Sequence, residues 1–64
     1  MMTLSNKTQW LATQSESNKV AFGGFLTSLL RAYGRADCGN RARIELAWRD
    51  DIEREFDMWY NRID

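Results

Sequence analysis

The stretch from Asn40 to Asp64, NRARIELAWRDDIEREFDMWYNRID, decides the fold of this chain. Its large apolar side chains recur at spacings of four, four, four, three and four residues. This is the period of one apolar stripe on an α-helix, because a strand would alternate every second residue. The charged residues between them predict that the other helix faces are exposed to solvent. The stripe consists of Ile44, Trp48, Ile52, Phe56, Trp59 and Ile63.

The middle of this stretch allows two interpretations. The stripe keeps its phase across Arg49–Asp51, and neither Pro nor Gly interrupts it, which favours one continuous helix over about 38–61. The alternative is a new helix that begins after Trp48, because Asp50 and Glu53 have the spacing of a capping box. We expect the continuous helix.

A short first helix is predicted near the N-terminus. It runs from Leu4 to about Gln14, and Thr3 or Ser5 can cap it. Its apolar content is low, so Trp10 is expected to be its anchor and to cover one end of the core.

The second predicted helix is strongly apolar. Ser15 or Ser17 is its expected N-cap, and it ends near Tyr33 with Gly34 as the C′ residue. Such a helix is expected to be buried on most sides, which requires more than one partner helix. Its apolar face contains Val20, Ala21, Phe22, Phe25, Leu26, Leu29, Leu30, Ala32 and Tyr33.

Gly23 and Gly24 lie inside this predicted helix, where each costs roughly 1 kcal/mol relative to alanine. The apolar spacing continues through them, so close approach of another helix backbone is the favoured explanation. The alternatives are a kink, or a helix that starts only near Phe25.

The fold class is predicted to be all-α, as a single small helical domain over residues 1–64. Asp37 or Asn40 is the expected N-cap of the third helix, and the short connection predicts that helices two and three form an antiparallel hairpin. A lone domain of this size is marginally stable. We therefore expect the hairpin to dimerise into a four-helix bundle, with a compact three-helix monomer as the competing architecture.

The formal net charge is zero, but its distribution is uneven. Residues 1–36 carry four basic groups and one acid, whereas residues 37–64 carry five arginines and eight acids. The favoured interpretation is attraction between two packed helices, and the alternative is an acidic face for a basic partner. A single cysteine, Cys38, and the lack of a secretory or membrane-spanning segment predict a reducing cytoplasm, with no membrane association.

Residues Ala36–Trp48, ADCGNRARIELAW, resemble small, mostly uncharacterised accessory proteins of bacteriophages and prophages. Those proteins show Ala-Asp, Asn, Arg-Leu and Ala-Phe-Pro at similar spacing. Here Ile44, Trp48 and Arg49 take the places of the Leu, Phe and Pro, so the helix break that the Pro implies is not expected. The resemblance implies a phage accessory gene whose product binds and redirects one host protein. It implies no catalytic residues.

Catalysis is not expected. The chain has no His, the usual general base near neutral pH, and its one Cys therefore has no imidazole partner. The acids between Asp50 and Asp57 are dense, but paired carboxylates need a concave site to act on a sugar or to hold Mg²⁺. We expect a solvated acidic face, no cofactor and no metal.

The favoured function is therefore a small non-catalytic regulator or inhibitor that binds a host protein and blocks its functional surface. Aromatic and arginine side chains dominate interface energies. The expected protein contacts are Trp48, Arg49, Met58, Tyr60 and Arg62.

Two other functions are considered. The first is a structural component of a larger assembly. The second is a nucleic-acid-binding accessory protein, which zero net charge disfavours. Its possible phosphate contacts are Arg31, Arg35, Arg41 and Arg43.

Overall fold

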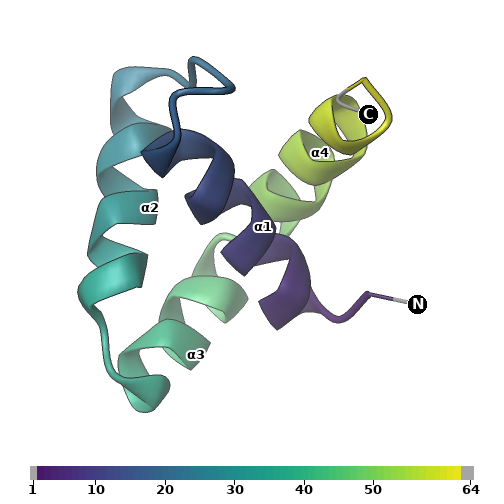
Figure 1. Cartoon of the computed structure of the whole chain (residues 1–64). Coiled ribbons are helices and arrows are strands. Elements are labelled where there is room, and N and C mark those ends of the chain that lie inside the picture. The colour runs from purple at the N-terminus through teal and green to yellow at the C-terminus, as the bar shows by residue number, and fades with distance from the viewer. Residues whose placement is uncertain (1, 63–64) are drawn as a thin grey trace.

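Four helices make up the computed structural model, which describes residues 2–62 (Figure 1). They are α1 (Leu4–Glu16), α2 (Gly24–Arg35), α3 (Cys38–Ala47) and α4 (Arg49–Tyr60). No strand occurs in this part of the chain, so the all-α prediction is confirmed. Ile63 of the predicted stripe lies outside the described residues.

The N-terminal helix is the centre of the fold. α1 packs against α2, α3 and α4, and it lies in the middle of Figure 1, with α2 on the left, α4 at the upper right and α3 below. A separate hairpin of the second and third helices is not confirmed, since α1 contacts both. The buried core joins α1, α2 and α4 through Leu11, Leu30, Ile52 and Phe56.

Polar side chains fill part of the buried face of α1. Thr8 is fully buried, and its hydroxyl donates a 2.8 Å hydrogen bond to the carbonyl of Leu4. Gln14 is also buried. The Thr3 hydroxyl accepts from the Asn6 amide at 3.1 Å, which confirms Thr3 as the N-cap. Because the buried Thr8 hydroxyl has a hydrogen-bond partner, α1 can lie at the centre of the fold although it contains few apolar residues.

The second helix begins later than predicted. Ser15 belongs to α1 and Ser17 is its C-cap, so neither caps α2. Asn18 has φ 59°, a left-handed conformation that asparagine tolerates and that turns the chain away from α1. Gly23 is the N-cap of α2 and Gly24 its first residue, so close helix packing at these glycines was wrong.

The predicted end of α2 was also wrong, because the helix continues past Tyr33 to Arg35. Gly34 lies inside the helix with a negative φ, and the extended Ala36 is the C-cap. Asp37 follows as the N-cap of α3, and its carboxylate accepts from the Asn40 amide at 2.8 Å. Asp37 is therefore the N-cap, whereas Asn40 lies within the helix.

The predicted continuous helix over 38–61 is wrong, because the chain bends at Trp48 with φ −115° and ψ 25°. A straight helix from Cys38 to Tyr60 would be about 34 Å long. That length exceeds the longest dimension of the fold, 31 Å. The bend lets both halves contact α1. Asp50 and Asp51 then lie in the first turn of α4, where negative charge is favourable.

Gly24→Ala is expected to stabilise the fold by roughly 0.5–1 kcal/mol, because alanine restricts the unfolded chain and favours a helix. A Cβ atom at Gly24 would meet no atom within 4 Å. Thermal unfolding followed by far-UV circular dichroism measures the change. The matched control is Gly23→Ala, which has the same open space but lies at the N-cap, where alanine is disfavoured. Equal effects at both positions would contradict the observed start of α2.

Candidate functional site: the aromatic surface and the arginine pocket

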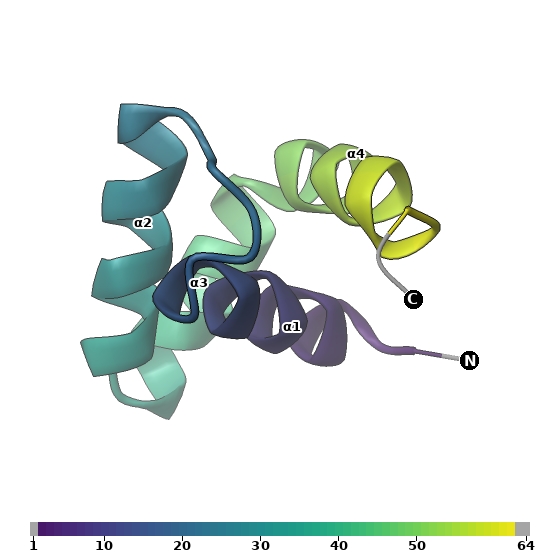
Figure 2. The same cartoon turned by 45° about the horizontal axis from the view of Figure 1, so that its top comes forward.

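Two aromatic pairs connect the start of α2 with α4. The Phe22 and Trp59 ring centroids lie 6.3 Å apart, and those of Phe25 and Trp48 lie 4.9 Å apart, both edge to face. The backbones of α2 and α4 stand apart in both views, with α1 and α3 between them (Figures 1 and 2). We call Phe22, Phe25, Trp48 and Trp59 the aromatic surface.

Phe25 is the most exposed member of the aromatic surface. Its side chain is 62% exposed, whereas Phe22, Trp48 and Trp59 are partly buried. An exposed apolar residue is common on protein surfaces, but this one is held in place by the Trp48 ring. On α3, Leu46 is 72% exposed, the largest value among the exposed large apolar residues of the described chain.

The predicted protein contacts do not form one face. Met58 and Tyr60 are both exposed, but residues two apart on a helix differ by about 200° in direction. The Tyr60 ring stacks on Phe56 at 4.6 Å and meets Trp10 edge to face at 5.3 Å. Tyr60 and Trp10 therefore cover the end of the core, which agrees with the expectation for Trp10.

The other predicted contacts occupy different positions. Trp48 lies at the bend, paired with Phe25, and Arg62 is exposed after α4. The Arg49 guanidinium donates to the Glu53 carboxylate at 3.3 Å. Among residues 2–62, Arg49 forms no ion pair with Glu45, four residues before it, because the bend lies between them and Glu45 bonds to other helices.

Glu53 connects α4 to α1 by an ion pair with Lys7, and it also pairs with Arg49 of its own helix. Its carboxylate lies 3.3 Å from the Arg49 guanidinium and 3.4 Å from the Lys7 ammonium. Hydrogen bonds from Arg49 and then Lys7 hold the pKa of the Glu53 carboxyl below its usual value. Because the folded pKa is lowered, this contribution to stability is present near neutral pH and is lost as the pH falls through the folded value.

A buried tyrosine joins three helices through one carboxylate. The Tyr33 hydroxyl donates to Glu45 Oε2 at 2.6 Å, and the Ser5 hydroxyl donates to the same oxygen at 2.8 Å. Burial, followed by the adjacent Glu45 carboxylate, raises the pKa of Tyr33 to about 12. The phenol therefore stays protonated near neutral pH, and the arrangement ties α1, α2 and α3 together.

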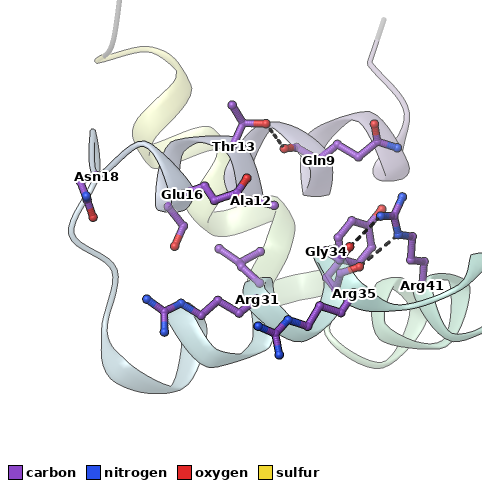
Figure 3. Close-up of a pocket in the computed structure, with 12 residues that line it drawn as sticks. Gln9, Ala12, Thr13, Glu16, Asn18, Arg31, Gly34, Arg35 and Arg41 are labelled. Carbon is purple, nitrogen blue, oxygen red and sulfur yellow. Dashed lines mark hydrogen bonds between the residues drawn. The ribbon is translucent and has the colours of Figure 1, made fainter.

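Three of the four predicted phosphate contacts lie around the same pocket. Arg31, Arg35 and Arg41 line one open pocket between α1 and α2, with a volume of about 570 Å³ (Figure 3). Arg43 does not line this pocket. We call this site the arginine pocket.

Comparison with protein-family models, curated proteins and solved structures finds no match for this chain. Within residues 2–62, no helix is long and apolar enough to cross a membrane. The same residues contain no group of three or more His, Cys, Asp or Glu side chains placed to hold a metal ion.

Sequence reasoning missed Phe25 and Leu46 as exposed residues. Phe25 lies four residues before Leu29 and was assigned to the buried face on that spacing. The two glycines before it could have indicated this exposure, because the helix begins at them and Phe25 therefore lies in its first turn. Leu46 lies two residues from both Ile44 and Trp48, so it falls on the face opposite the apolar stripe.

Proposed function

We propose that this chain is a small non-catalytic regulator of phage type that binds one protein of a bacterial host and blocks its functional surface. Phe25 supports this most directly, because its ring is 62% exposed and yet held against Trp48. A pre-positioned aromatic side chain loses little conformational entropy when a partner covers it. The phage-type origin rests on the resemblance at residues 36–48.

A partner with an apolar pocket and a basic border fits the charges beside this surface. α4 begins directly after Trp48 and carries five acids against two arginines. The Glu55 carboxylate accepts a 3.1 Å hydrogen bond from the Trp59 indole and forms no ion pair within residues 2–62, so its charge lies beside the aromatic surface. Opposite charges around an apolar centre accelerate association and select the partner.

Occlusion is the proposed mechanism. Phe25 and Trp48 enter the partner's apolar pocket, and Arg49, which follows Trp48 directly, contacts its border. Met58 lies on the opposite side of α4 from Arg49, so it does not contact the same border. Covering a fully exposed Phe side chain contributes roughly 1.5–3 kcal/mol. Tyr60 contributes at its exposed edge only, because its ring face is stacked on Phe56.

A second copy of this chain is the competing occupant of the aromatic surface. The expected homodimer would bury Phe25 against its symmetry mate, in line with the opposite charges of the two halves of the sequence. Light scattering on the purified protein shows whether a second copy of the chain occupies the aromatic surface. The expected homodimer is compatible with the host-protein proposal only if it forms away from Phe25, so that Phe25→Ala leaves the dimer intact. A dimer that dissociates on Phe25→Ala would assign the surface to self-association and overturn the proposal.

Affinity capture from bacterial lysate, followed by direct titration, tests the proposal. We expect one host protein to be retained by the wild type and by Ser28→Ala, which changes an exposed α2 residue outside the aromatic surface. The Phe25→Ala variant is expected to retain none of this host protein. With the purified partner, Phe25→Ala should raise the dissociation constant at least tenfold, about 1.4 kcal/mol. Higher salt should slow association, because charge attraction is screened.

Equal capture by Phe25→Ala and Ser28→Ala would contradict the proposal, provided that circular dichroism shows both variants folded. Capture that depends on added nucleic acid would favour the nucleic-acid alternative, and gel shift at rising salt would measure it. Co-purification with particles rather than with a single host protein would favour the structural component.

A further inference from the structure

The arginine pocket lies between the C-terminal half of α1 and α2 (Figure 3). Its volume of about 570 Å³ falls within the range of small-molecule sites, 300–1,000 Å³. Leu30 and Ala12 provide apolar lining, and Gln9 and Thr13 provide polar groups. The proposed protein-binding function uses none of these residues.

Arg41 maintains the shape of the pocket. Its Nε donates to the Tyr33 carbonyl at 3.0 Å, and its Nη2 donates to the Gly34 carbonyl at 3.2 Å. The guanidinium also lies over the Tyr33 ring, 5.1 Å from its centroid. Arg41 thereby satisfies carbonyls at the C-terminal end of α2 and offsets the negative end of that helix.

Arg31 and Arg35 are available for a ligand. They are four residues apart on α2, so their side chains lie on one face, as Figure 3 shows. Both are exposed, and neither forms an ion pair with a described residue. Two adjacent unpaired guanidinium groups repel each other modestly, and an anion between them would remove that repulsion.

The charge of the pocket favours an anion. Three arginines line it against one acid, Glu16, so its formal charge is positive although the whole chain has none. Guanidinium groups bind phosphate oxygens in a planar, two-pronged geometry. Ala12 provides most of the apolar surface that the organic part of a ligand would meet, because Leu30 is only 2% exposed.

We infer that the arginine pocket binds a small phosphate monoester, with Arg31 and Arg35 on the phosphate and the apolar lining against the organic part. This inference is independent of the proposed protein partner. The same phosphate chemistry occurs in a free nucleotide and in a nucleic-acid backbone, and we assign the pocket to the free nucleotide because its volume is that of a small-molecule site.

A titration with adenosine 5′-monophosphate, followed by amide resonances in nuclear magnetic resonance spectra, tests the inference. We expect chemical-shift changes in the C-terminal halves of α1 and α2, which line the pocket. The expected dissociation constant is on the order of 10⁻⁴–10⁻³ M. The double variant Arg31→Ala/Arg35→Ala should weaken binding at least tenfold. Glu16→Gln should tighten it several-fold, because the one opposing charge is removed.

Arg54→Ala is the matched control, since Arg54 is exposed on α4 and lies outside the pocket. It should leave the affinity unchanged, and adenosine without phosphate should not bind. Equal weakening by Arg54→Ala would show general charge attraction and overturn the inference. So would binding of a short single-stranded oligonucleotide in the absence of binding by the monophosphate.

Discussion

Ile52→Ala is expected to remove most of the stability of the protein at 25 °C. Ile52 is fully buried in the middle of the core, among Leu11, Leu30 and Phe56. Truncating a buried isoleucine to alanine costs about 2–5 kcal/mol, partly because a cavity remains. A chain of this size has a total stability of only a few kcal/mol, so the loss consumes most of it.

Thermal unfolding measures this effect. A loss of 2 kcal/mol or more corresponds to a fall in Tm of at least about 8 °C for a domain of this size. The matched control is Leu46→Ala, which removes a similar number of apolar atoms from a side chain that is 72% exposed. The control should change stability by less than about 0.5 kcal/mol. If both variants unfolded alike, the assignment of α4 to the core would be wrong.

Alkaline pH is expected to destabilise the protein through Tyr33. Its pKa is raised from 10.0 to about 12 by burial and by the Glu45 carboxylate. A raised folded pKa means that the stabilising contribution is complete below pH 10 and is lost as the pH rises from 10 to 12. At 1.36 kcal/mol per pH unit, the loss is roughly 2–3 kcal/mol.

Urea unfolding at a series of alkaline pH values measures this loss. Tyr33→Phe should remove the Tyr33 part of the pH dependence, although it also removes a hydrogen bond to a carboxylate and so lowers stability near neutral pH. Tyr60→Phe is the control, because its exposed hydroxyl donates no hydrogen bond among those of the described residues. Identical alkaline slopes for wild type and Tyr33→Phe would contradict this explanation.

Local rules predicted much of the fold. Ile52 and Phe56 lie on the predicted stripe and are buried, because apolar periodicity directly reflects which face of a helix meets the core. Thr3 and Asp37 were named as candidate N-caps and both accept the expected amide. Caps depend on short-range geometry, so a sequence shows them well.

Tertiary packing determined what the sequence did not show. The bend at Trp48 occurs without a break in periodicity, because contact of both halves with α1 selects it. The central position of α1 was missed, since Thr8 and Gln14 are polar and were not counted as buried. Phe25 was missed as a site residue, because four-residue spacing does not show where a helix begins.

The dependence of α1 on α4 has a consequence during synthesis. In α1, the inward side chain Leu11 packs with Ile52 and Phe56, which are synthesised some forty residues later. Until then Leu11 and Trp10 are accessible to chaperones and proteases, and no N-terminal fragment can close the core. The four helices are therefore expected to fold only after α4 has left the ribosome, in one step that joins residues some forty positions apart.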